Sequence, residues 1–386
     1  MALDFREIRK QVNQLGEKAP GRAQEITMLY DRAFELLDSS PQEIERVRRT
    51  AARVVQDHDP SLRCAMPVSD ELTTSFPAPT LPGKGTIIAV DGSQISPDRH
   101  AQVYYGLINL GAVQMRQGDK GAPRIEIESR LLYDEQLYTR TGIISDDSFS
   151  LKRDLNERVW LTELARKADP PVIALTDGPV ELWGARQGED SSEFGESLKA
   201  YLEALAGLES LGVTTCGYVD NPAANLAVRF LEMGLIPEDE LSSVRSRYPL
   251  RGVFDRELFK RVLGKGERSI VFAIQSRGSR EYSGNLELHF FYLNVGLERN
   301  DWIVRVEAPA WVVYNEKKLK QLHALLVDQC RILGNRPYPY ILHRAHESAL
   351  VSMAEKEQVS NMIINELHSR GVKVGAESPK PTLKRL

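Results

Sequence analysis

Two aspartates stand where short apolar runs end, and a glycine follows each of them. The run 86–90 leads into Asp91, and the run 172–176 leads into Asp177. If the two runs are neighbouring strands of one sheet, their carboxyl ends bring the two side chains together. Carboxylates placed side by side repel each other unless a divalent cation lies between them. A single Asp-Gly pair is most often a tight turn, but two of them at paired strand ends predict a site for Mg²⁺ or Mn²⁺.

A third carboxylate is expected from a helix predicted over residues 147–167. Leu151, Leu155 and Val159 mark the buried stripe of this helix, and Glu157 lies near the edge of the stripe. Most glutamates on a helix are solvated surface groups. In the strand order predicted for this region, the helix packs near the two aspartates. Glu157 is therefore a candidate third metal ligand.

Two further positions have suitable chemistry. Asp220 ends a fifth predicted strand and precedes Asn-Pro, which is also a natural turn and helix start. His343 and His346 are three residues apart at the start of the last predicted helix. A neutral imidazole can ligate Mg²⁺ or Mn²⁺ weakly or carry a proton to a leaving oxygen, although most helix histidines are packed or surface groups.

Charge is divided unevenly along the chain. Residues 177–240 hold 13 acids against 3 Lys and Arg, whereas residues 245–280 hold 10 Lys and Arg against 3 acids. Eight of those ten are arginines, whose planar guanidinium pairs well with phosphate, and aromatic residues lie between them. Arginine with aromatics suits unstacked nucleic acid, although a solvated loop or a partner surface has the same composition. The predicted DNA contacts are Arg245, Arg247, Tyr248, Arg251, Arg256, Arg268 and Arg277.

The whole composition is that of a globular protein. The 386 residues are 42% hydrophobic and 27% charged, with a formal net charge of -4, which argues against indiscriminate coating of nucleic acid. No apolar run is long enough for a membrane span and the N-terminus lacks the pattern of a secretion signal, so we expect a cytoplasmic protein that does not bind membranes. Cys64, Cys216 and Cys330 are expected to be core residues rather than disulfide or zinc partners.

The elements that must position these residues follow the order β-β-β-α-β-α-β. The predicted ranges are strands at 86–90, 103–113, 124–133, 172–176 and 213–219, with helices at 147–167 and 192–210. This order is typical of an α/β ribonuclease-H-like mixed sheet and of one half of an actin-like ATPase. Helices are predicted over 3–60, additional strands and helices follow residue 234, and one long final helix is predicted over 341–369.

Four segments are predicted along the chain. The proline-rich stretch 66–85 is expected to be a linker or an irregular surface segment. The predicted segments are an N-terminal helical region with its linker (1–83), a ribonuclease-H-like core (84–234), a basic insertion with strands that contacts DNA (235–300), and a C-terminal strand and helices that complete the nuclease domain (301–386).

Six motifs together resemble the NurA nuclease family over roughly residues 85–370. They are IIAVDGSQ (87–94), ALTDGPVELWG (174–184), GYVDNP (217–222), GERSIVF (266–272), IVRVEAPAW (303–311) and PYILHRAHESALVS (339–352). The order and spacing of the motifs are more specific than any one of them.

The resemblance implies a function and a set of site residues. NurA proteins have a ribonuclease-H-like fold, act as dimers, and degrade DNA by 5′→3′ exonuclease and single-strand endonuclease activity with Mn²⁺ or Mg²⁺. They work with HerA, a hexameric ATP-driven DNA translocase, in end resection at double-strand breaks. The catalytic aspartates of the family fall on Asp91 and Asp177, and its C-terminal histidine falls on His346. Its helix glutamate is best matched by Glu157, with Glu163 as the alternative, whereas Asp220 lies in a family-like motif without a firm metal role.

The function predicted from these observations is metal-dependent DNA cleavage. The first alternative is an actin-like or ribonuclease-H-like ATPase or phosphotransferase, but no duplicated unit and no Walker A motif is present. The second is an inactive adaptor that docks on a translocase ring through the N-terminal helices. Tight ATP binding would favour the first, and failure to cut any DNA with Mn²⁺ would favour the second.

Overall fold

The computed structural model describes residues 3–81, 83–98, 101–119, 121–139, 142–184, 191–297 and 300–374. Its contacts divide the chain into two units, each assembled from separate stretches. The first unit comprises Met1–Ala78, Val219–Ser283 and Glu287–Val306, and the second comprises Pro79–Tyr218, Gly284–Leu286 and Glu307–Leu386. The chain leaves and re-enters each unit, so the units do not follow the four consecutive segments predicted from the sequence.

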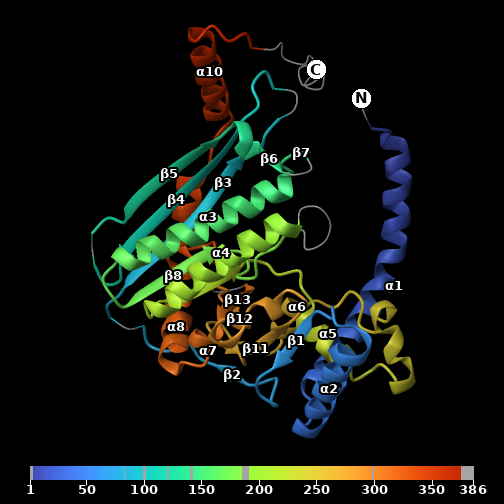
Figure 1. Cartoon of the computed structure of the whole chain (residues 1–386). Coiled ribbons are helices and arrows are strands. Elements are labelled where there is room, and N and C mark those ends of the chain that lie inside the picture. The colour runs from blue at the N-terminus through green and yellow to red at the C-terminus, as the bar shows by residue number, and fades with distance from the viewer. Residues whose placement is uncertain are drawn as a thin grey trace. The chain divides into compact units, whose positions relative to one another are not determined.

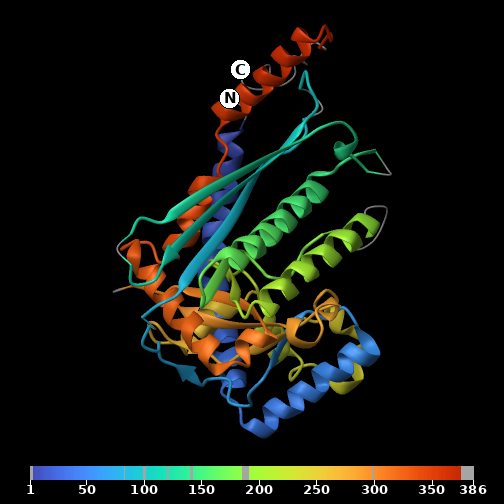
Figure 2. The same cartoon turned by 60° about the vertical axis from the view of Figure 1, so that its left-hand side comes forward.

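The second unit contains the predicted β-β-β-α-β-α-β order (Figures 1 and 2). Its five main strands lie in the order β9-β8-β3-β4-β5 within a larger mixed sheet. β3, β4 and β5 are antiparallel neighbours, whereas β8 runs parallel to β3 and β9 runs parallel to β8. The elements are β3 (Thr86–Ile95), β4 (Gly106–Arg116), β5 (Arg124–Leu132), α3 (Asp146–Lys167), β8 (Val172–Asp177), α4 (Ser191–Ser210) and β9 (Thr214–Val219).

The sequence explains these elements locally. The β-branched run at the start of β3 suits a strand that is buried on both faces. α3 begins where the Ser145 side chain accepts a hydrogen bond from the Ser148 N–H, and two aspartates in its first turn favour the positive end of the helix dipole. α3 and α4 lie side by side, as both views show.

β3 is longer than predicted. The expected strand ended at residue 90, but pairing with β4 continues to Ile95, and Asp91 is paired with Gly111. Asp91 therefore lies within the strand rather than in a turn after it. The hairpin partner explains the difference, because β4 continues the ladder past the apolar run on which the prediction depended.

The prediction of one long helix over 341–369 is also wrong. This segment forms two helices, α9 (Tyr340–Ala349) and α10 (Met353–Ser369), separated at Leu350, which has an extended backbone. The Ser352 side chain accepts from the Glu355 N–H while the Glu355 carboxylate accepts from the Ser352 N–H. This capping box starts a new helix, and its S-x-x-E signature was present in the sequence.

The first unit contains the predicted N-terminal helices and a group of short strands. α1 (Phe5–Leu37) and α2 (Pro41–Arg53) confirm the helical prediction, and a π-helical turn over Val54–His58 follows. The stretch 66–85 is not only a linker, because Ser75–Phe76 forms β2 and pairs with β10, and because β1, which overlaps its start, pairs with β11. The strands are β1 (Cys64–Pro67), β2 (Ser75–Phe76), β10 (Arg268–Ser269), β11 (Phe272–Gln275), β12 (Leu288–Asn294) and β13 (Ile303–Pro309), whose chain continues into the second unit.

The remaining elements are short, apart from α8, which is long and largely buried. In the first unit they are α5 (Leu226–Glu232), η3 (Glu238–Ser246), α6 (Asp255–Phe259) and η4 (Ser279–Glu281), and in the second they are η2 (Asp134–Leu137), β6 (Tyr138–Thr139), β7 (Gly142–Ile143), η5 (Gly284–Leu286), α7 (Ala310–Val313) and α8 (Glu316–Ile332). All three cysteines are buried, as predicted. Within the described ranges, none of the helices is long and apolar enough to cross a membrane.

Candidate active site

A hollow of about 330 Å³ opens in the second unit where β3 and β8 carry their aspartates. Five carboxylates line it, and two arginines and one histidine accompany them. The acids are Asp91, Asp154, Glu157, Asp177 and Glu181, and the bases are Arg153, Arg158 and His346. We call this hollow the carboxylate pocket.

His346 reaches the carboxylate pocket from α9. Its Nδ1 lies 2.7 Å from Asp91 Oδ2, and its side chain is about half exposed, whereas that of Asp91 is largely covered. The end of α9 is fixed to the sheet because the side chains of Ser93 and Asn109 both donate to the Ala349 carbonyl. These bonds satisfy a helix-terminal acceptor and hold the histidine over β3.

Gly111 makes this packing possible. It is the residue of β4 that is paired with Asp91. A Cβ at Gly111 would lie 2.6 Å from the Ala349 nitrogen and 2.7 Å from the Ala345 carbonyl oxygen. Those are backbone atoms of α9 and the residue that ends it, and they cannot rotate away, so the helix packs this closely only against a glycine.

Glu157 enters the pocket from α3 through a second close approach. A Cβ at Gly92 would lie 2.5 Å from Glu157 Oε1. Glu157 is only 9% exposed, and burial raises its pKa well above the ordinary value, with the charges of Asp154 and Asp91 adding to the shift. Arg153 opposes this shift, with its Nε 3.3 Å from Glu157 Oε1.

Asp154 shares that arginine. Its Oδ1 accepts from Arg153 Nη2 at 2.7 Å and from Arg153 Nε at 3.1 Å. Burial still raises the pKa of the Asp154 carboxyl, although Arg153 acts in the opposite direction. One guanidinium therefore serves two carboxylates and leaves the pocket short of positive charge.

Asp177 is the last residue of β8, and the chain turns sharply after it. Gly178 has a φ of +81°, a conformation that glycine adopts readily, and its N–H donates to Asp177 Oδ1 at 3.1 Å. The following loop is held by the buried Glu307 carboxylate, which accepts from the Val180 N–H at 2.9 Å, and by the Tyr201 hydroxyl, which donates to the Val180 carbonyl. The aspartate is thus presented on a rigid turn.

Arg158 provides a buried positive charge beside the acids. It is 2% exposed, and its Nε and Nη2 donate to the Tyr201 hydroxyl and to Thr176 Oγ1, both at 3.1 Å. Its Nη1 has no hydrogen-bond partner in the described part of the chain. Both acceptors are neutral, so they do not neutralise the positive charge of Arg158, which acts on the carboxylates of Glu157 and Asp154.

The donor set of the pocket fits a divalent cation. Five carboxylates face two guanidinium groups, so the site carries excess negative charge, and the pKa of Glu157 is raised first by burial and then by the charges of Asp154 and Asp91. Carboxylate oxygens favour Mg²⁺ or Mn²⁺ over zinc. Among the residues that the structure describes, no three His, Cys, Asp or Glu side chains are arranged as a metal cluster; two of the acids, Asp91 and Glu157, instead contact His346 and Arg153.

The structure brings four predicted site residues together and separates two others from them. Asp91, Glu157, Asp177 and His346 all line the carboxylate pocket. Glu163 is exposed on α3 and is not part of the lining. Asp220 is not part of it either, and its carboxylate accepts from the Trp302 indole N–H at 2.7 Å.

Sequence reasoning missed Asp154 and Glu181 as pocket residues. Asp154 is three residues before Glu157 and therefore shares its helix face, a spacing that was visible in the sequence. Glu181 is buried and lies four residues after Asp177, in the turn that follows β8. Its position depends on how that turn folds, which no periodicity indicates.

Most of the predicted DNA-contacting arginines have partners inside the first unit. Arg245 pairs with Asp59 and Arg247 pairs with Glu240, both at 2.8 Å. Arg256 donates to the Asn221 side chain, Arg251 lies 5.5 Å from the centre of the Tyr248 ring, and Arg277 is exposed. Arg268 lies 4.0 Å from the centre of the Phe76 ring, and burial lowers the pKa of its guanidinium to about 10. DNA contact by this segment stays a prediction.

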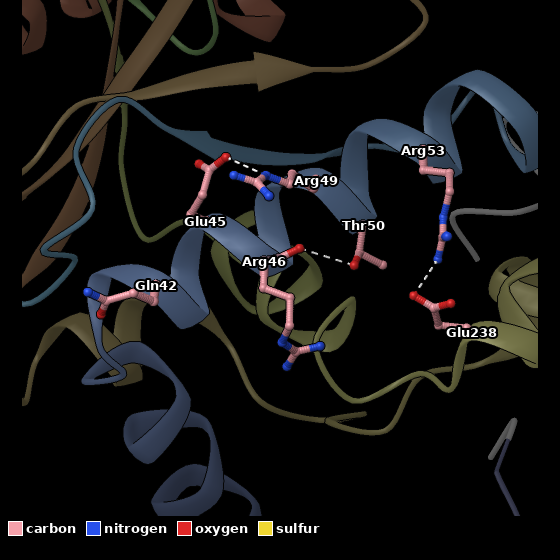
Figure 3. Close-up of a pocket in the computed structure, with 7 residues that line it drawn as sticks. All are labelled: Gln42, Glu45, Arg46, Arg49, Thr50, Arg53 and Glu238. Atoms are coloured by element: carbon pink, nitrogen blue, oxygen red, sulfur yellow. Dashed lines mark hydrogen bonds and ion pairs between the residues drawn. The ribbon is translucent and has the colours of Figure 1, made fainter.

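A second charged hollow, of about 450 Å³, lies on α2 in the first unit (Figure 3). Its two acids each pair with an arginine, Glu45 with Arg49 at 2.9 Å and Glu238 with Arg53 at 3.1 Å. Arg46 also lines it, so that positive charge is in slight excess. This hollow therefore lacks the crowding of carboxylates that marks the pocket of the second unit.

The fold and the carboxylate pocket together define a ribonuclease-H-like α/β protein with an acidic site at adjacent strand ends. Within that class, the family model described as the NurA domain matches residues 85–351, well over half of the chain. The chain therefore belongs to the NurA family, and this membership supports nuclease activity. No match was found among curated proteins.

A solved NurA structure shares the fold. The crystal structure of the NurA nuclease from Sulfolobus solfataricus matches with a TM-score of 0.51 and 13% identity, covering 95% of this chain and 98% of that one. A second NurA crystal structure matches with a TM-score of 0.38 and 14% identity over 91% and 97% of the two chains. The catalytic domain of human Endonuclease V matches with a TM-score of 0.33 and 13% identity over 73% and 85%.

Proposed function

We propose that the protein is a metal-dependent DNA nuclease and that the carboxylate pocket is its active site. The observation that carries the proposal is the convergence of Asp91, Glu157, Asp177 and His346, from four separate elements of the second unit, on one hollow. Membership of the NurA family supports the same conclusion. Asp91, Glu157 and Asp177 would hold one or two Mn²⁺ or Mg²⁺ ions, which would supply activation of water and neutralisation of the charge on the scissile phosphate.

The side chains of the pocket have separate roles in this proposal. Nδ1 of His346 is engaged with Asp91 Oδ2, so Nε2 is the atom at which the imidazole takes up or releases a proton during cleavage. Arg158 and Arg153 limit the repulsion between the carboxylates and act to lower the pKa of Glu157 and of Asp154, against the larger opposing effect of burial. The turn at Gly178 holds Asp177 in a fixed orientation, which favours catalysis by limiting reorganisation.

The finer features of the function come from the family resemblance. We propose 5′→3′ exonuclease and single-strand endonuclease activities that resect DNA ends in double-strand break repair, in the cytoplasm and in concert with a HerA-type hexameric ATPase. We also propose a homodimer. The exposed apolar residues in the N-terminal half of α1, including Phe5, Val12 and Leu15, support an interaction surface there.

An end-labelled DNA assay tests the proposal. Single-stranded and duplex substrates are incubated with the full-length protein in Mn²⁺, Mg²⁺ or EDTA. We expect cleavage with Mn²⁺ or Mg²⁺ and none with EDTA. Asp91→Ala and Asp177→Ala should each abolish cleavage while unfolding at nearly the wild-type temperature, and Asp98→Ala, an exposed aspartate beyond the same strand, is the matched control. Full activity in either pocket variant would refute the assignment.

A further inference from the structure

Another hollow, distinct from the one on α2, adjoins the carboxylate pocket and shares two residues with it. Its volume is about 490 Å³, within the usual range for small-molecule sites. Asp177 and His346 line both hollows. The remaining lining residues are Leu333, Arg336, Tyr338 and His343. Anything bound here therefore lies directly beside the proposed catalytic groups.

The walls of this hollow combine an apolar face with positive charge. Leu333 and Tyr338 are half-buried, and Arg336 is exposed. Within the described ranges, the Arg336 guanidinium has no hydrogen-bond or ion-pair partner. The His343 imidazole has only a long contact with Glu347, at 3.4 Å. An aromatic ring beside an unpaired guanidinium is the combination that recognises a base together with a phosphate.

The aromatic wall is held in place. The rings of Tyr338 and Tyr218 meet edge to face, with centroids 5.4 Å apart. The Tyr338 N–H donates to the Arg336 carbonyl at 2.8 Å, and the Tyr218 hydroxyl donates to the Pro337 carbonyl. Because β9 carries Tyr218, the sheet fixes the segment that lines the hollow. A fixed ring loses little entropy when a ligand stacks on it.

We propose that this hollow is a nucleotide subsite that holds the nucleotide next to the scissile phosphate. Tyr338 and Leu333 contact the base, and Arg336 contacts its phosphate. Asp177 and His346, which the two hollows share, mark the boundary at which the chain passes from the subsite to the cleaved bond. The proposal rests on the proposed function only for the identity of the cleaved bond, since nucleotide binding can be measured without cleavage.

Thymidine 5′-monophosphate is the probe, titrated into the full-length protein with Mn²⁺ and followed by calorimetry. We expect Arg336→Met and Tyr338→Ala each to weaken binding about tenfold, since stacking and phosphate contacts each contribute on that order. Mn²⁺ affinity should be unchanged in both. Arg331→Met, which removes an exposed arginine outside the lining, is the matched control. Tyr338→Phe keeps the ring and should bind as the wild type does, which guards against loss of folding in Tyr338→Ala.

A second measurement locates the nucleotide on the substrate. Single abasic positions are introduced along a single-stranded oligonucleotide, and KM for cleavage is measured. The wild type should show a raised KM for the abasic position next to the cleaved bond, and Tyr338→Ala should be insensitive to that position. Wild-type binding of the mononucleotide by Arg336→Met and Tyr338→Ala would overturn the subsite. Binding that depends on both residues in a protein that cuts no DNA would preserve the subsite and overturn the nuclease proposal.

Discussion

His346 Nδ1 and Asp91 Oδ2 are 2.7 Å apart although 255 residues separate them in the sequence. The bond joins α9, near the C-terminus, to strand β3. It fixes which imidazole nitrogen is available for proton transfer. Two features of the second unit bring these side chains together: the absence of a side chain at Gly111 and the anchored end of α9.

Replacing His346 tests its chemical role. His346→Ala should lower kcat for DNA cleavage about 10²- to 10⁴-fold, the usual contribution of a positioned general acid or base. The side chain is about half exposed, so the unfolding temperature should change little. His368→Ala, on exposed α10, is the matched control. Cleavage within a few-fold of wild type by His346→Ala would assign the histidine a merely structural role.

Gly111 should be essential for the same geometry. A methyl group there would meet the α9 backbone at 2.6 Å, and such overpacking costs about 1–3 kcal/mol. Gly111→Ala should therefore unfold at lower urea concentration and lose cleavage, because α9 and its histidine are displaced together. Gly195→Ala, in α4 with nothing within 4 Å of the new carbon, should be neutral or slightly stabilising. Equal stability of the two variants would contradict close packing of α9 on β4.

The sequence predicted those elements and site residues that local hydrophobic periodicity and short motifs determine. The order of strands and helices in the second unit follows from alternating apolar runs, and the two Asp-Gly pairs that follow apolar runs led to Asp91 and Asp177. Long-range packing was not accessible in this way. The continuation of β3 past residue 90 and the place of Glu181 in the pocket depend on which element packs on which, a relationship that local patterns do not contain. The capping box that begins at Ser352 was visible in the sequence and was missed.

Glu157 gives a pH dependence with a definite sign. Its folded pKa is raised well above the ordinary value of 4.5 by burial and by neighbouring acids. At pH values between 4.5 and the raised folded pKa, the Glu157 carboxyl stays protonated in the native state but is ionised in the unfolded chain. The stability it contributes is therefore complete below pH 4.5 and is lost as pH rises through the folded pKa. Glu157→Gln removes the ionisation, so in EDTA the variant should gain on the wild type in unfolding temperature as pH rises.

Addition of Mn²⁺ should reverse the order of unfolding temperatures, so that the wild type becomes more stable than Glu157→Gln. Mn²⁺ binds the ionised site of the native wild type and stabilises it by mass action, whereas Glu157→Gln should gain much less. Thermal unfolding at several pH values, with Mn²⁺ and with EDTA, measures both effects. Glu163→Gln changes an exposed glutamate on the same helix and should follow the wild type throughout. A Mn²⁺ response that is lost in Glu163→Gln and kept in Glu157→Gln would exchange the roles of the two residues.

The basic segment should separate into arginines that hold the fold and arginines that contact DNA. Arg268 lies over the Phe76 ring and donates to the Ser269 carbonyl, so Arg268→Ala should lower the unfolding temperature. Arg277 is exposed, so Arg277→Ala should leave stability unchanged and weaken single-stranded DNA binding. The slope of log affinity against log salt should fall by about 0.7, the amount expected for one phosphate contact on a single strand. Anisotropy titrations over a range of salt concentrations measure the slope, and an unchanged slope for Arg277→Ala would remove that residue from the DNA path.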